Sequence, residues 1–207
     1  MNYTKGATVK FALKQSLPVL FGYLFLGSAF GIMLYKAGYN WLWAIFISLI
    51  VYAGSGQFLL VSLISAKADI ATTALMTLFI NTRHMFYGLS YIEKFKAGKW
   101  RYPFMIFTLT DETYSVNSSI LSVPENVDET KARFLIGEFN HFYWIAGSAL
   151  GSLLSQLIPI DFPLLFLIKS IKITTKRADK FLLPSLLITV VILSSLKKFF
   201  ETEEVAK

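Results

Sequence analysis

The sequence predicts an all-α, polytopic transmembrane helix bundle of about six or seven membrane segments, some of them broken. Three observations support this class. Hydrophobic residues make up 55% of the 207 residues, and the mean hydropathy is +0.55. Charged residues make up 16%, against about 25% in soluble domains. Several apolar runs are long enough to cross a bilayer. The length fits one integral membrane domain over 1–207.

The first apolar run, residues 17–34, follows a segment that carries Lys5, Lys10 and Lys14. It is longer than the core of a cleaved signal peptide and leads into Gly-Tyr-Asn at 38–40, a turn signal. We therefore expect a retained first helix. The net charge of +7 is typical of cytoplasmic loops near anionic lipid, so the N-terminus is predicted to be cytoplasmic.

The second run, 41–66, contains a Gly-Ser-Gly-Gln sequence at 54–57. Two glycines and a serine weaken a helix, and lipid permits an unwound point only where the backbone faces a cavity. Gln57 is placed there to hydrogen-bond a zwitterionic ligand, although it could equally tie two helices together.

The third and fourth runs, 70–92 and 102–123, carry ionisable groups of opposite sign. Asn81, Arg83 and His84 lie in the third run, and Asp111 and Glu112 in the fourth. Such groups inside a membrane are usually paired and often line a substrate or ion path. Arg83 is the expected partner of one of the carboxylates. The structural alternative is a pair that only fixes helix register, with His84 a buried imidazole.

The later runs are 134–159, a short one at 162–168 and a marginal one at 181–196. A Gly-Ser-Ala-x-Gly sequence occurs at 27–31 and again at 147–151. These small-residue patterns allow close helix approach and suggest an internal, possibly inverted, repeat with halves at about 15–100 and 134–200. If every run crossed the membrane, the basic loop at 94–101 would lie outside. Re-entrant segments would remove this conflict, and the runs carrying 54–57 and 81–84 are the expected ones.

Recognised enzymatic signals are missing from the sequence. It has no cysteine, only two histidines, no clustered metal-ligand spacing and no phosphate-binding Gly-x-x-x-x-Gly-Lys-[Ser/Thr] loop. We therefore expect neither an enzyme nor a bound cofactor or metal ion.

Several of these elements together resemble the AzlC family. They are Pro18 with its glycine-rich helix, Tyr-Ala-Gly at 52–54 with Gln57, Asn-Thr-Arg-His at 81–84, Thr-Asp-Glu at 110–112, the glycine pattern at 147–151 and Ile-Asp-Phe at 160–162. The resemblance covers about 17–162. It implies an inner-membrane secondary exporter of branched-chain or similar hydrophobic amino acids that works with a small AzlD-like membrane subunit. After residue 162 the lysine- and arginine-rich stretch 169–180 departs from the family pattern.

Under this hypothesis the substrate-binding residues are Gln57, Asn81 and Arg83, with Arg83 on the substrate carboxylate. Asp111 or Glu112, together with His84, would carry a coupling proton. The alternative function is a non-transporting membrane scaffold or a passive channel, whose charges only hold helices together.

Overall fold

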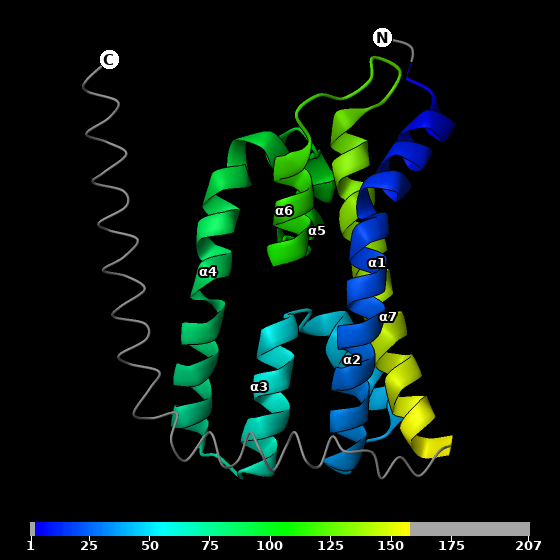
Figure 1. Ribbon diagram of the computed structural model, residues 1–207. Coiled ribbons are helices and arrows are strands. Elements are labelled where there is room, and N and C mark those ends of the chain that lie inside the picture. The colour runs from blue at the N-terminus through cyan, green and yellow to red at the C-terminus, as the bar shows by residue number, and fades with distance from the viewer. Residues whose placement is uncertain (1–2, 158–207) are drawn as a thin grey trace, which may run out of the picture. The chain divides into compact units, whose positions relative to one another are not determined.

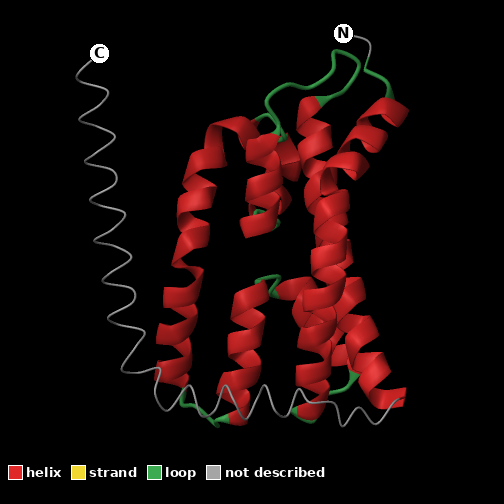
Figure 2. Ribbon diagram, viewed as in Figure 1, coloured by secondary structure: helices red, strands yellow, loops and turns green. Residues whose placement is uncertain are grey.

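The computed structural model describes residues 3–157, and all regular secondary structure in this range is helical (Figures 1 and 2). The elements are α1 (Lys5–Lys36), α2 (Trp41–Ile50), α3 (Gly54–Ser65), α4 (Ile70–Lys96), a 3₁₀ turn (Lys99–Arg101), α5 (Tyr102–Phe107), α6 (Asp111–Ser119) and α7 (Glu129–Leu157). The all-α prediction is confirmed for this part of the chain. The predicted runs 162–168 and 181–196, and most of the second half-repeat, lie outside the described residues.

Helix α1 contains the first predicted run and extends it toward the N-terminus through the three lysines. Among the described helices, α1 alone is long and apolar enough by composition to cross a membrane, whereas α2 and α3 are apolar but short. It ends where the sequence predicts, because Gly38 takes a positive φ of 96° that other residues rarely adopt. The number of membrane crossings remains a prediction.

The second run is broken, as predicted. Helices α2 and α3 form a hairpin that turns at residues 51–53, and the Gln57 side-chain amide donates to the Ser48 hydroxyl across it at 3.1 Å. Tyr52, at the turn, has φ of 37°, an unfavourable left-handed conformation for a residue with a side chain. The strained residue is held by burial, since only 3% of its surface is exposed.

A second hairpin occurs where none was expected. Helices α5 and α6 are separated at residues 108–110, and Thr110 caps α6 by accepting the N–H of Thr113. In Figure 1, α3 begins at mid-height and runs toward one end of the described unit, while α6 begins at mid-height and runs toward the other. The first turns of both helices therefore lie in the middle of this unit.

The predicted break at 81–84 is wrong, because α4 is continuous from Ile70 to Lys96. The prediction fails because polar side chains at these positions leave the backbone hydrogen bonds of a helix intact. A break needs backbone groups with other partners or special dihedral angles, and Tyr52 supplies such an angle in the second run.

The two copies of the repeated glycine sequence pack directly on each other, in α1 and α7. A Cβ added at Gly147 would lie 2.6 Å from the Tyr23 carbonyl oxygen, and one at Gly31 or Gly151 would overlap the backbone of Ser148 or Ser28. Only glycine permits this approach, as the small-residue pattern predicts. The two helices run in the same direction, whereas the two hairpins point in opposite directions (Figure 1).

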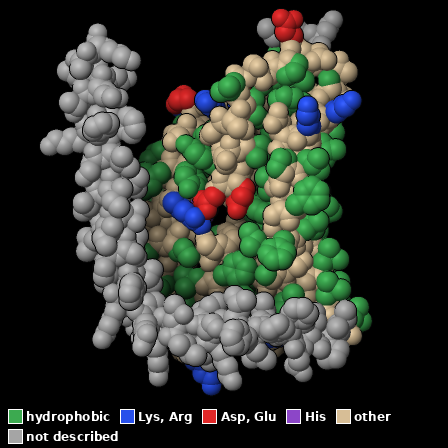
Figure 3. Space-filling view, in the orientation of Figure 1, with side chains coloured by type: hydrophobic (Ala, Val, Ile, Leu, Met, Phe, Trp, Pro, Cys, Tyr) green, Lys and Arg blue, Asp and Glu red, His purple; other side chains and the backbone are tan. Residues whose placement is uncertain are grey.

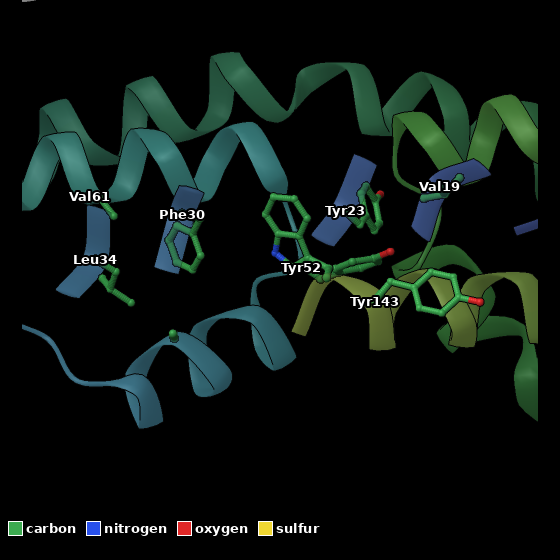
Figure 4. Packing of buried hydrophobic residues seen from close by; sticks show 9 residues of the cluster. Val19, Tyr23, Phe30, Leu34, Tyr52, Val61 and Tyr143 are labelled. Atoms are coloured by element: carbon green, nitrogen blue, oxygen red, sulfur yellow. The ribbon is translucent and has the colours of Figure 1, made fainter. Parts of the chain in front are cut away.

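The main hydrophobic cluster joins α1 and α7 to the α2–α3 hairpin. Phe30 and Leu34 of α1 lie on the side of Val61 in α3, while Tyr23 lies near Tyr52 at the turn of the hairpin (Figure 4). Trp144 packs edge-on against Tyr23, with ring centroids 5.1 Å apart. This aromatic layer places the turn of the hairpin at the centre of the unit.

Candidate functional site

The site is built around an ion pair between α4 and the start of α6. An Arg83 guanidinium nitrogen (Nη1) lies 2.5 Å from Asp111 Oδ2, and the other terminal nitrogen (Nη2) donates to the Ser55 hydroxyl on α3. The side chains of Arg83 and Asp111 are 41% and 33% exposed. The predicted meeting of opposite charges from separate runs is confirmed, and it joins α4 to both hairpins.

A second carboxylate lies beside this pair. Glu112 accepts a 2.7 Å hydrogen bond from the Tyr23 hydroxyl, whose oxygen is also 2.7 Å from the Thr110 hydroxyl oxygen. These groups surround a cavity of about 30 Å³ lined by Tyr23, Tyr52, Gly54, Ser55, Arg83, His84, Thr110, Asp111, Glu112 and Trp144. Figure 3 shows acidic and basic side chains gathered around a hollow at mid-height, within a largely apolar face.

The first turns of α3 and α6 differ in how their backbone N–H groups are satisfied. Helix α6 has Thr110 as a side-chain cap and carries Asp111 and Glu112 in its first turn. Helix α3 begins after Ala53, with no side-chain cap and no acidic residue. Because unpaired N–H groups and the helix dipole make a helix start positive, α3 with Arg83 offers an anion site. The acidic start of α6 offers a cation site.

Several buried polar atoms around this centre have no hydrogen-bond partner among the described residues. They are the Tyr52 hydroxyl, Asn81 Oδ1, Arg83 Nε and Asp111 Oδ1. Leaving such an atom unpaired costs about 1–3 kcal/mol, so their concentration in one place needs an explanation. Two of them belong to the ion pair itself. The site can thus form further hydrogen bonds with a polar ligand.

Four of the six predicted site residues line the cavity: Arg83, His84, Asp111 and Glu112. Gln57 does not line it and is fully buried; its carbonyl oxygen accepts from Trp144 Nε1 at 2.8 Å. Its amide is used as well, within the hairpin. Gln57 thus reaches the cavity through Trp144, and a direct contact with substrate stays a prediction.

Asn81 does not line the cavity either. It lies one helical turn before His84 on α4, and its side-chain amide faces α3, where a Cβ added at Gly56 would lie 3.4 Å from Asn81 Oδ1. The lack of a side chain at Gly56 lets α4 approach the start of α3. The binding role predicted for Asn81 also stays a prediction.

Six residues of the cavity are not among the predicted site residues: Tyr23, Tyr52, Gly54, Ser55, Thr110 and Trp144. A signal existed for Thr110, because a threonine before two acidic residues is typical of a helix start. Tyr52 and Ser55 adjoin the predicted break. Nothing local distinguishes Tyr23 or Trp144 from the other aromatic residues of apolar helices, because their place depends on how α1 and α7 pack.

Comparison with known proteins gives relatives named as membrane proteins. The chain is 38% identical over 152 residues to an uncharacterized membrane protein of Helicobacter pylori, covering 73% of this chain and 66% of that protein. It is 31% identical over 155 residues to the branched-chain amino acid transport protein AzlC of Bacillus subtilis, covering 75% of this chain and 61% of that protein. With the inner membrane protein YgaZ of Escherichia coli K12 it shares 26% over 202 residues, 93% of this chain and 76% of that one.

The chain thus matches slightly less than two thirds of the length of its Helicobacter and Bacillus relatives. No solved structure matches it. The model of the family described as AzlC protein matches residues 18–158, which include both hairpins, α4 and the whole charged centre. This chain belongs to the AzlC family.

Proposed function

We propose that this chain is the large subunit of a secondary-active exporter that moves branched-chain or similar hydrophobic amino acids across the inner membrane. The Bacillus relative named as a branched-chain amino acid transport protein supports the substrate class. The observation that carries the proposal is the Arg83–Asp111 ion pair between two hairpin starts. We also propose a small AzlD-like partner subunit, as the resemblance to the family implies.

In the proposed topology α1, α4 and α7 cross the membrane and the two hairpins enter it from opposite sides. At 1.5 Å per residue, α4 with 27 residues is about 40 Å long, enough for the hydrocarbon core. Broken helices whose starts meet at the midplane are a common form of transporter binding site. The backbone at residues 51–53 and 108–110 then faces protein and cavity, as lipid requires.

If every run crossed the membrane, the basic loop at 94–101 would lie outside. The hairpin α2–α3 removes this conflict, because the second run does not cross. Because this hairpin returns to the end from which it started, α4 leads back to the end at which α1 begins (Figure 1). Lys5, Lys10 and Lys14 then share one side with the basic loop at 94–101. The positive-inside rule makes that side cytoplasmic, which supports a cytoplasmic N-terminus.

The two helix starts give the substrate an orientation. Its carboxylate binds at the uncapped start of α3, where Ser55 and the Arg83 guanidinium provide donors. Its ammonium group binds at the acidic start of α6, next to Asp111 and Glu112. The zwitterion takes the place of each partner in the Arg83–Asp111 pair, so both charges remain paired while the helices separate. Asn81, whose side-chain amide faces α3, can donate its N–H groups to the substrate carboxylate.

Proton coupling is assigned to the carboxylates. Protonation of Asp111 or Glu112 removes the negative charge that holds the ammonium group and weakens the hold on Arg83. His84, on the same cavity and one residue from Arg83, completes the set of titratable groups. Because protonation and ammonium binding compete for the same carboxylates, an inward proton exchanges for an outward amino acid.

The test is efflux of leucine and valine from preloaded cells, with Arg83→Ala compared with Arg101→Ala. Arg101 lies outside the cavity and stacks on Trp100 at 4.9 Å. Loss of a charge-assisted contact of about 1.5–3 kcal/mol predicts at least about a tenfold fall in efflux for Arg83→Ala, with protein still in the membrane. Efflux equal to that of Arg101→Ala would reject the proposed site. In vesicles, a wild-type efflux rate that does not change with the proton gradient would favour a passive channel.

A further inference from the structure

The cavity at the ion pair is too small to hold a whole hydrophobic amino acid. Its volume of about 30 Å³ suits about two or three water-sized groups, because a single water needs about 10–15 Å³. The wall of the cavity consists mostly of charged and hydroxyl-bearing side chains. It can therefore receive the charged ends of a substrate, and an apolar side chain needs a neighbouring space.

Such a space lies on the other side of the same wall. A groove of about 420 Å³ runs between α1 and α6, and its lining shares Tyr23, Asp111 and Glu112 with the cavity. The rest of the lining is mainly apolar or small: Pro18, Val19, Gly22, Leu26, Ser115 and Val116. The groove and the cavity are thus adjoining compartments separated by the Tyr23–Glu112 hydrogen bond.

The part of the groove lining that α1 contributes lies mainly on one face of this helix. Pro18, Gly22 and Leu26 follow at intervals of four, so they lie on one face of the helix. A Cβ added at Gly22 would have no atom of residues 3–157 within 4 Å, in contrast to Gly27 and Gly31 on the α7 side. Packing does not require glycine at this position. Its missing side chain instead contributes to the open volume beside Glu112.

We propose, building on the transport function above, that this groove receives the apolar side chain of the substrate and that Gly22 determines how large that side chain can be. With the ammonium group at Asp111 and Glu112, the Cα of the substrate lies at the shared wall. Its side chain then points past Tyr23 into the groove, along Gly22 and Val116. A branched aliphatic chain meets apolar walls there, and alanine leaves most of the groove unfilled.

The experiment compares Gly22→Leu with Gly6→Leu. Both glycines lie in α1 and have open space at Cβ, but Gly6 lies four turns away, outside the groove. Efflux of leucine and alanine is measured in the same cells. Gly22→Leu should lower the leucine-to-alanine efflux ratio at least about tenfold, the discrimination that one or two methylene groups provide, while Gly6→Leu leaves it unchanged.

A second measurement does not depend on transport. The chain has no cysteine, so Ser115→Cys places one thiol in the groove. Added leucine should slow its labelling by a maleimide more than added alanine does, and Gly22→Leu should abolish that difference. Equal slowing by both amino acids, or none by either, would overturn the proposal and fit a groove filled by lipid. An unchanged efflux ratio in Gly22→Leu would overturn it while the proposed function stands; wild-type protein that moves neither amino acid would remove both.

Discussion

Helices α4 and α7 have nearly the same length, 27 and 29 residues, but they are held in very different ways. In α7 thirteen residues are buried, spread from Ala132 to Ser155. In α4 only Tyr91 and Phe95 are buried among the described residues, and both lie in its last two turns. Large apolar side chains earlier in α4 are exposed, including Ile70 at 88% and Phe79 at 71%.

From this difference we infer that the α1–α7 pair is a rigid frame and that α4 is the helix that moves. In lipid, helices gain little from burying apolar groups, so association depends on close packing and polar contacts. The glycine contacts of α7 with α1 supply the close packing. Helix α4 instead carries Arg83, and its middle is fixed to the hairpins by the bonds of that side chain to Asp111 and Ser55. We propose that α4 shifts against the α1–α7 pair when substrate replaces those bonds.

The largest effect is expected from a bulky side chain in the frame. In Gly31→Leu the new Cβ would overlap the Ser148 carbonyl oxygen, which belongs to the backbone and cannot rotate away. The helices must separate along their length, at a cost near the upper end of overpacking, about 3 kcal/mol. We expect little folded protein in the membrane and a much lower Tm in detergent.

The matched control is Gly22→Ala, in the same helix. Its Cβ meets open space, and replacing glycine by alanine in a helix interior stabilises by about 1 kcal/mol. Its Tm should stay equal or rise. If Gly31→Leu were as stable as this control, the close α1–α7 contact would not be the frame of the protein.

A smaller loss of stability, with a complete loss of transport, is expected at the ion pair. Arg83→Gln or Asp111→Asn alone leaves one charge without its partner. Because both side chains are partly exposed, the cost should be about 1 kcal/mol rather than the larger value of a fully buried pair.

The double variant distinguishes a functional pair from a structural one. With both residues neutral, no charge is unpaired, so thermal stability should return close to that of wild type while leucine efflux remains absent. Efflux that recovers together with stability would mean that the pair only fixes helix register, as the structural alternative holds.

The α1–α7 contact and the charged centre were each predicted in part from the sequence. Close helix approach at glycines 27, 31, 147 and 151 follows from the local pattern, but the pairing of α1 with α7 is shown only by the structure. The pairing of Arg83 with either Asp111 or Glu112 was predicted as well, since opposite charges inside a membrane require each other. Both depend on a physical demand that few arrangements can satisfy.

The second hairpin could not be predicted in the same way. Residues 108–110 contain neither glycine nor proline. Thr110 before two acidic residues indicates a helix start, but the packing of Thr108 against Gly137 is visible only in the structure. The polar 81–84 sequence suggested a break that α4 does not have, because polarity of a side chain and continuity of a backbone are separate properties. Two roles were predicted for Gln57: binding a zwitterionic ligand, or linking two helices. Its contacts with Ser48 and Trp144 favour the link between helices.

The smallest effect is expected at the start of α4, and it tests how loosely this helix is held. Asp69 caps α4 by accepting the backbone N–H of Thr72 at 2.9 Å, and these hydrogen bonds lower the pKa of its carboxyl group. The stabilisation is therefore present above the unfolded-state pKa of about 3.9 and is lost as the pH falls through the lower folded-state pKa. Asparagine caps a helix as well but does not titrate in this range.

Wild type and Asp69→Asn should accordingly have similar Tm values at pH 7, and the wild type should lose Tm relative to the variant below about pH 4. The control is Asp128→Asn at the start of α7, where Asp128 accepts the N–H of Lys131 at 3.0 Å. Because α7 is fixed by its packing against α1, Asp128→Asn should change the Tm less than Asp69→Asn does below about pH 4. A larger effect at Asp128 would contradict the division into frame and moving part, since a local cap should matter most where a helix has little else to hold it.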